Sequence, residues 1–185
     1  DILPRFFDSG TLEMSEVTPT ISPSMDIQVS SNFERFLFEL YGRDGTVVSE
    51  NMAEFRNTGK LSIGDNLWES ARERFDGFRL DDGETKAVIG EVHAASGYLL
   101  DPHSAIGVAA AREKAGDPAT PIVSLATAHP AKFPDAVEEA SGLRPALPPA
   151  LADLLDRPEQ VTVLPNDLGQ VEAFVRGHVS LPGAA

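Results

Sequence analysis

A chain of 185 residues with 42% hydrophobic and 24% charged residues is long enough for one globular domain or part of a larger one. Its formal net charge of −14 argues against nucleic acid and anionic membranes as partners, because both are bound through basic surfaces. The lack of cysteine excludes disulfides, thiolate metal sites and a cysteine nucleophile, and no apolar run approaches the roughly 18 residues of a spanning helix. We therefore expect a soluble, cytoplasmic protein.

The first ten residues, DILPRFFDSG, predict the end of a helix that is already under way. Its apolar side chains recur on one helical face, at Ile2, Leu3, Phe6 and Phe7. Gly10 is a typical residue at which such a helix ends. Because the chain does not open with methionine, we interpret it as a piece of a longer protein.

A serine-rich segment, SPSMDIQVSS, predicts a loop that leads into a second helix. Ser31 followed by Glu34 is a capping-box pattern, which places a helix between this point and Gly42. Amphipathic spacing predicts further helices over residues 46–57 and 65–75, separated by a turn and a short extended piece.

The dipeptide Asp82-Gly83 is compatible with either a hairpin turn or the start of a helix. We favour the helix because apolar residues follow at helical spacing and Gly97 is a suitable residue for its end. A small-residue helix over 104–115 comes next, after a break at Asp101-Pro102, and its Gly107 permits a close approach of a neighbouring segment.

The run PIVSLAT, residues 121–127, predicts the most convincing strand of the chain. Three more helices are predicted beyond it, in PDAVEEASG, PPALADLLD and NDLGQVEAFVRGHV. Helices outnumber strands, yet the apolar strand lies between helices, which favours the α/β class.

Several familiar site types are not supported. The four histidines lack the spacing of a zinc site, so no metal centre is expected. The chain also has no G-x-S-x-G elbow, no P-loop and no G-x-G-x-x-G turn. A self-contained hydrolase or nucleotide-binding fold is therefore not indicated.

The polar candidates each allow two interpretations. The segment SPSMDIQVSSNFER offers hydroxyls, free backbone N–H groups and Arg35 to an anion, or it is an ordinary solvent-exposed helix start. His103 and His129 can belong to a site, or each can be a hydrogen-bonded loop residue beside a proline. Likewise, Asp101 can simply cap the helix that follows, and Lys132 can be a solvated charge.

Three motifs in order, SPSMDIQVSSNFER, GYLLDPHSAIG and ATAHPAKFPDAVEEA, resemble the C-terminal half of the threonine synthase family. DILPRFF and NDLGQVEAFVRGH are similar to that family too, so the resemblance runs nearly from end to end. It implies an α/β fold, the C-terminal portion of a fold type II (tryptophan synthase β-like) pyridoxal-phosphate enzyme, helix-rich with few strands. Residues 1–150 would form the C-terminal part of the catalytic region, and residues 151–185 a helical extension.

The resemblance also implies the reaction, which converts O-phospho-L-homoserine and water to L-threonine and phosphate, with pyridoxal 5′-phosphate as cofactor. A neutral hydroxyl facing the pyridine nitrogen would leave that nitrogen largely unprotonated, which favours elimination and replacement. The implied cofactor-binding residues are Thr127, which supplies this hydroxyl, Ala126, Asp101 and His103. The implied substrate-binding residues are Ser24, Asp26, Ser31, Asn32 and Arg35, and the pocket-lining residues are His129 and Lys132. Asp26 would either receive the substrate amine or order its loop.

No lysine of this chain lies in the family's Schiff-base motif, and the family's glycine- and asparagine-rich phosphate loop is not found either. We therefore expect the chain to be inactive alone and to work with a missing N-terminal half of the same enzyme, or to pack with copies of itself. Two alternatives stay open. One is a threonine synthase-like phospho-lyase, and the other is a non-catalytic binding or interaction module derived from this fold.

Overall fold

The computed structural model describes residues 1–179. The chain divides into two compact units, Asp1–Leu147 and a second one that begins at Pro148. Among the described residues, every helix is too short or too polar to span a lipid bilayer.

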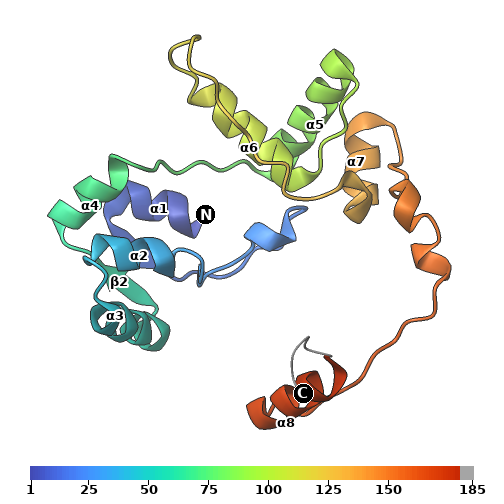
Figure 1. Ribbon diagram of the computed structural model, residues 1–185. Helices are drawn as coiled ribbons and strands as arrows, with labels where there is room; N and C mark the ends of the chain where they lie inside the picture. Colours follow the sequence, from blue (N-terminus) through green and yellow to red (C-terminus); the bar gives the residue numbers. More distant parts are fainter. Residues whose placement is uncertain (180–185) are drawn as a thin grey trace. The chain divides into compact units, whose positions relative to one another are not determined.

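The first part of the larger unit groups four helices beside a two-stranded antiparallel sheet (Figure 1). In the sheet, Leu12 lies opposite Leu61, and both side chains are buried. The strand that follows Gly10 was not predicted from the sequence. The elements are α1 (Ile2–Ser9), β1 (Thr11–Glu13), α2 (Glu34–Leu40), α3 (Gly45–Thr58), β2 (Lys60–Ser62) and α4 (Asp65–Arg72).

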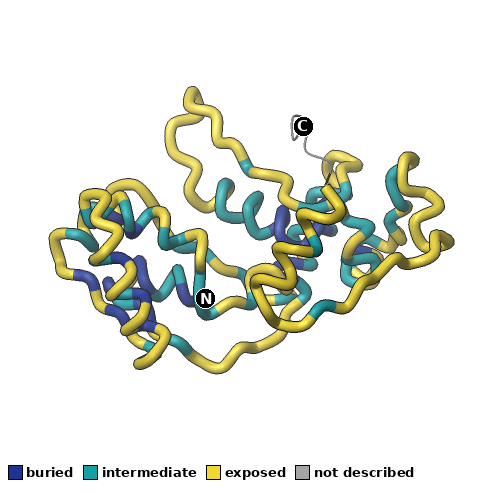
Figure 2. Tube along the Cα trace, turned by 60° about the horizontal axis from the view of Figure 1, so that its bottom comes forward, coloured by how far each residue is buried: buried dark blue, intermediate teal, exposed yellow. Residues whose placement is uncertain are grey.

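A cluster of aromatic and aliphatic side chains holds these elements together, and Figure 2 shows the buried residues gathered in the packed helices. Phe6, Leu37 and Phe55 are at most 1% exposed. The rings of Phe7 and Phe33 meet Phe6 edge-on, with centroids 5.2 and 5.0 Å from it. Such pairs contribute about 0.5–1.5 kcal/mol each beyond the area that they bury.

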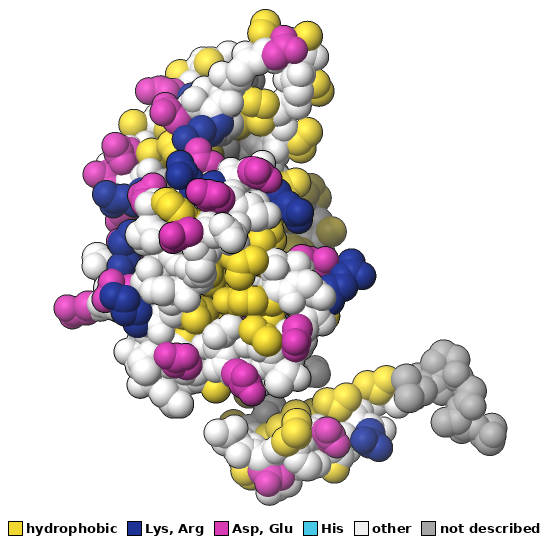
Figure 3. All heavy atoms as spheres, turned by 90° about the vertical axis from the view of Figure 1, so that its left-hand side faces the viewer, with side chains coloured by type: hydrophobic (Ala, Val, Ile, Leu, Met, Phe, Trp, Pro, Cys, Tyr) yellow, Lys and Arg dark blue, Asp and Glu magenta, His cyan; other side chains and the backbone are white. Residues whose placement is uncertain are grey.

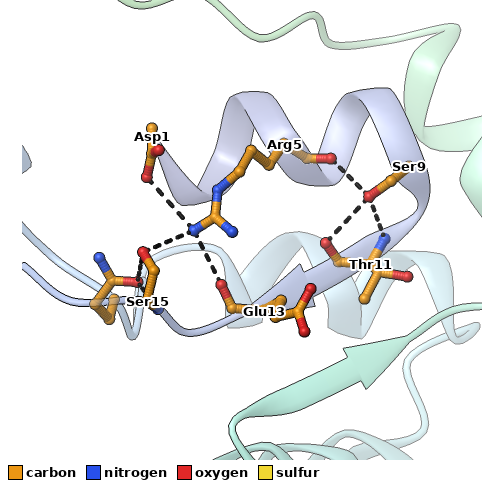
Figure 4. Close-up of polar contacts among 7 residues, drawn as sticks. Asp1, Arg5, Ser9, Thr11, Glu13 and Ser15 are labelled. Atoms are coloured by element: carbon orange, nitrogen blue, oxygen red, sulfur yellow. Dashed lines mark hydrogen bonds and ion pairs between the residues drawn. The ribbon is translucent and has the colours of Figure 1, made fainter.

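Polar contacts fasten α1 to the segment around β1 (Figure 4). The Arg5 guanidinium donates to the Glu13 carbonyl at 3.0 Å and to the Ser15 hydroxyl at 3.1 Å. The Ser9 hydroxyl donates to the Arg5 carbonyl at 2.7 Å and accepts the Thr11 N–H at 3.3 Å. The Arg5 and Ser9 side chains thus connect α1 by hydrogen bonds to Thr11 and Glu13 of β1 and to Ser15 beyond it.

The predicted capping box before α2 is wrong. The helix begins after Phe33, and no side chain caps it, so Ser31 lies in a turn outside the helix. The Glu34 carboxylate, which would have completed the box, instead pairs with Arg56 at 2.8 Å. A cross-helix ion pair has thus replaced the local cap.

The second part of the larger unit packs three helices around Ile89, Leu100 and Ala105, which are at most 5% exposed. Asp81 caps the first of these helices in a reciprocal capping box with Glu84, so the helix interpretation at this point is confirmed. The helices are α5 (Asp82–Ser96), α6 (Pro102–Glu113) and α7 (Pro134–Ser141).

The strand predicted at residues 121–127 is wrong, because this segment is irregular and largely exposed. Val123 and Leu125 are 78% and 73% exposed. A strand needs a hydrogen-bonded neighbour, and both strands found among residues 1–179 pair only with each other. The segment instead approaches α6, where a Cβ on Gly107 would lie 2.9 Å from the Ser124 hydroxyl. Gly107 therefore permits the close approach that the sequence predicted.

The second unit has little regular structure before its last helix. PPALADLLD, predicted as a helix, instead forms two short 3₁₀ turns, η3 (Pro149–Leu151) and η4 (Leu154–Asp156). The predicted final helix is confirmed as α8 (Leu168–His178), with the Asp167 carboxylate accepting the Gln170 N–H at 2.9 Å.

Charged side chains of both signs are interspersed over the surface, with hydrophobic side chains between them (Figure 3). Arg144, for example, pairs with Asp135 at 3.0 Å and with Glu138 at 2.6 Å. Exposed pairs of this kind contribute only about 0–1 kcal/mol, so the core and the caps carry the stability of the fold.

Candidate functional site

The N-terminus of α6 gathers polar groups that are almost completely buried. Asp101 caps the helix and is 1% exposed. Its Oδ1 atom accepts the backbone N–H groups of His103 at 2.9 Å and Ser104 at 3.4 Å. Pro102 at the first helical position has no N–H that would need a partner. The sequence Asp-Pro-His-Ser therefore starts a helix by itself, and the capping role considered for Asp101 is confirmed.

The same carboxylate also holds two side chains. His103 Nδ1 lies 3.1 Å from Asp101 Oδ1, and the Ser104 hydroxyl donates to Asp101 Oδ2. His103 and Ser104 are 6% and 2% exposed. A buried carboxylate that accepts from this many donors has a fixed orientation, since any rotation would leave buried polar groups without partners.

The imidazole of His103 connects this centre to the serine-rich loop. The N–H of Ser24, in the turn η1 (Pro23–Met25), donates to His103 Nε2 at 3.2 Å. Nε2 is therefore an acceptor, and the ring proton resides on Nδ1, from which it is donated to Asp101. Phe133 packs against the imidazole, with ring centroids 4.8 Å apart.

The hydroxyl of Ser104 connects the same centre to Thr127. The Thr127 backbone N–H donates to Ser104 Oγ at 3.2 Å. The Thr127 side chain is exposed, and its hydroxyl forms no hydrogen bond to any of residues 1–179. Ala126 and Ala128 on either side are small, so a flat ring can reach this hydroxyl. A free donor on a fixed backbone suits the nitrogen of a heteroaromatic cofactor.

Asp26 closes the serine-rich loop on itself. Its two carboxylate oxygens accept the Thr20 N–H at 2.7 Å and the Thr20 hydroxyl at 2.8 Å. Ser24 and Asp26 also line a cavity of about 650 Å³ between this loop and residues 78–85. The geometry favours the loop-ordering role for Asp26, because its oxygens are already occupied.

The remaining predicted residues lie outside this hydrogen-bonded centre. Ser31, Asn32 and Arg35 are exposed at the start of α2, and no hydrogen bond within residues 1–179 joins them to Asp101 or His103.

His129 precedes the short turn η2 (Pro130–Lys132), and Lys132 is its last residue. His129 Nδ1 accepts the Ala131 N–H at 3.1 Å, and the Lys132 ammonium lies 5.9 Å from the centroid of the Phe133 ring. Both residues are exposed, and this turn leads directly into α7.

Sequence reasoning missed Ser104 and Phe133. A serine three residues after a capping aspartate was a signal for Ser104, since that position faces the cap. Phe133 carried no comparable signal. Across residues 1–179, no group of three or more His, Asp or Glu side chains is placed to hold a metal ion.

Comparisons with known proteins identify relatives of this arrangement. The family model described as threonine synthase, C-terminal, matches residues 104–175. Threonine synthase of Pseudomonas aeruginosa is 52% identical over 179 residues, which make up 96% of this chain and 38% of that protein. Threonine synthase of Saccharomyces cerevisiae is 40% identical over 157 residues, covering 76% of this chain and 30% of that protein. The chain thus spans well under half the length of the curated relatives that it matches.

Solved structures show the same relationship. The PLP-bound threonine synthase from Brucella melitensis is 52% identical with a TM-score of 0.82, covering 96% of this chain and 38% of that chain. The yeast threonine synthase is 35% identical with a TM-score of 0.77, covering 95% and 40%. These neighbours confirm the predicted fold class, a helix-rich α/β portion of a fold type II enzyme.

Proposed function

We propose that this chain, which belongs to the threonine synthase family and corresponds to its C-terminal part, supplies one wall of a threonine synthase active site. The reaction would convert O-phospho-L-homoserine and water to L-threonine and phosphate. The observation that carries this proposal is the hydrogen-bonded path from Ser24 to Thr127, which runs through the buried residues His103, Asp101 and Ser104. It joins the three motifs that resemble the family into one site.

The chain's part in holding pyridoxal 5′-phosphate would centre on Thr127. Its unpartnered hydroxyl can donate to the ring nitrogen while the backbone stays anchored to Ser104. When bound, the cofactor supplies a conjugated ring that withdraws electrons from the substrate carbon. Ala126 leaves space beside that ring. Asp101 is buried and holds the Thr127 backbone through Ser104, whereas the buried His103 holds the loop of Ser24.

The substrate carries a phosphate and a carboxylate, which require hydroxyl, N–H and guanidinium donors. Ser24, Ser31 and Asn32 are exposed and offer such groups. Arg35 is exposed as well, and no ion pair to it is found within residues 1–179. We assign phosphate or carboxylate binding to these four residues and loop ordering to Asp26.

None of the four lysines of this chain has the surroundings of the family's Schiff-base lysine. Three of them form ion pairs on the surface, Lys60 with Glu13 at 3.6 Å, Lys86 with Glu139 at 2.8 Å and Lys114 with Asp76 at 2.5 Å. A paired, protonated ammonium is a poor nucleophile. The lysine that binds the cofactor would therefore come from the remainder of the enzyme, and we expect the 185-residue chain alone to release no phosphate from O-phospho-L-homoserine.

The test is a steady-state assay of the complete enzyme that contains this chain. Phosphate and threonine should form in equal amounts from O-phospho-L-homoserine, and Thr127→Val should lower kcat/KM by about 10- to 100-fold, because removal of a hydrogen bond to a charged or polarised group costs about 1.5–3 kcal/mol. Thr127→Ser keeps the hydroxyl and should retain most of the activity. Turnover of a phosphothreonine-type substrate in preference to O-phospho-L-homoserine would instead identify the phospho-lyase alternative.

A further inference from the structure

One buried carboxylate holds two separate segments of the proposed site. The Thr127 arm runs from the Thr127 N–H to Ser104 Oγ and on to Asp101 Oδ2. The Ser24 arm runs from the Ser24 N–H to His103 Nε2 and from Nδ1 to Asp101 Oδ1. We infer that Asp101 is a positioning residue that fixes both arms at once. The importance of this role for catalysis rests on the proposed function.

The hydrogen bonds along both arms run in one direction. Thr127 and Ser24 can only donate through their backbone N–H groups, so Ser104 Oγ and His103 Nε2 must accept. Each of these side chains has then one proton left, and each proton is donated to Asp101. The centre therefore requires a group that accepts on both of its oxygens, and an ionised carboxylate is the side chain that does so.

An asparagine at position 101 would keep the cap in one orientation of its amide only, and both arms in neither orientation. Asparagine caps a helix about as well as aspartate. Its amide, however, presents one acceptor and one donor. With the NH₂ group towards Ser104, the hydroxyl proton of Ser104 loses its acceptor. With the NH₂ group towards His103, it opposes the two backbone N–H groups of the cap, and the ring proton is forced onto Nε2, where it opposes the Ser24 N–H. Either orientation releases one arm.

The two arms can also be cut separately. Ser104→Ala removes the acceptor of the Thr127 N–H and leaves His103 untouched. His103→Asn keeps a donor near the position of Nδ1 but no longer reaches the Ser24 N–H. Asp44→Asn is the matched control, because Asp44 caps α3 through the N–H groups of Thr46 and Val47 and belongs to neither arm.

The first measurement needs neither cofactor nor substrate. Hydrogen exchange of the Thr127 amide in the enzyme should accelerate about tenfold in Ser104→Ala and stay unchanged in His103→Asn and Asp44→Asn. Imidazole ¹⁵N shifts should show the proton of His103 on Nδ1 in the wild type. An unchanged Thr127 exchange rate in Ser104→Ala, or a proton on Nε2, overturns the inference.

The second measurement separates positioning from general stability. Ser104→Ala should weaken cofactor binding, followed by its absorbance, about tenfold with little change in the KM for substrate. His103→Asn should raise that KM about tenfold and leave cofactor affinity unchanged. The positioning role is overturned if Ser104→Ala and His103→Asn change cofactor affinity and the KM for substrate equally. It is also overturned if Asp44→Asn has the same effects. A wild-type enzyme that makes no threonine refutes the proposed function. The hydrogen-exchange and ¹⁵N results do not depend on that activity, so they test the link between the two arms separately.

Discussion

The packing of α5 on α7 depends on a position that has no side chain. A Cβ atom built on Gly90 would lie 2.8 Å from the Ala140 carbonyl oxygen. Because that atom belongs to the backbone of α7 and cannot turn away, Gly90→Ala must push the two helices apart, at a cost in the upper part of the overpacking range, about 2–3 kcal/mol. Alanine is better than glycine in a helix by about 1 kcal/mol. The net result should be a loss of stability of about 1–2 kcal/mol, measured by urea unfolding.

Gly177→Ala is the matched control for this prediction. Gly177 also lies in a helix, α8, but nothing lies within 4 Å of the Cβ that it would gain. The control should therefore be neutral or stabilising by up to about 1 kcal/mol, opposite in sign to the effect at Gly90. If Gly90→Ala proves as stable as the parent chain, α5 and α7 do not approach each other as closely as described and the reasoning fails.

Three further changes probe the rest of the fold. Phe6→Ala empties a fully buried site and should lower the free energy of unfolding by about 3–5 kcal/mol in urea titrations. Trp68→Phe removes the indole donor that lies 3.0 Å from the Phe7 carbonyl and should cost about 1 kcal/mol by the same assay. The hydrogen bond from Lys114 lowers the pKa of the Asp76 carboxyl, so its stabilising effect is present above the unfolded-state pKa and is lost as the pH falls through the folded-state pKa. Lys114→Gln should raise the pKa of Asp76 in an NMR titration, and an unchanged value would contradict the pair.

Helices of this chain could be predicted because their signals are local. The ends of α1, α5 and α7 were marked by Gly10, Gly97 and Gly142, and all three glycines adopt left-handed φ angles of 72–75°. A cap or a stop requires only the residues beside it. The failure at Ser31 and Glu34 has a non-local cause, since Arg56 competes for the carboxylate from another helix.

The site could be predicted only in part. The motifs made Asp101, His103 and Thr127 candidates, but no pattern showed that a single carboxylate links Ser24 to Thr127. Such a link depends on the tertiary approach of three segments that lie far apart in the sequence. The direction of these hydrogen bonds and the tautomer of His103 can be assigned only once those segments are in place.

The segment 121–127 illustrates both local sequence signals and tertiary contacts. Its apolar, β-branched composition is that of a strand, yet Ile122, Val123 and Leu125 are exposed by 49%, 78% and 73%. Strand formation depends on a hydrogen-bonded neighbour, and both strands among residues 1–179 pair only with each other. The backbone of Thr127 is nevertheless already tied to α6 through Ser104. The start of α6, and not a strand, therefore fixes the backbone position of Thr127.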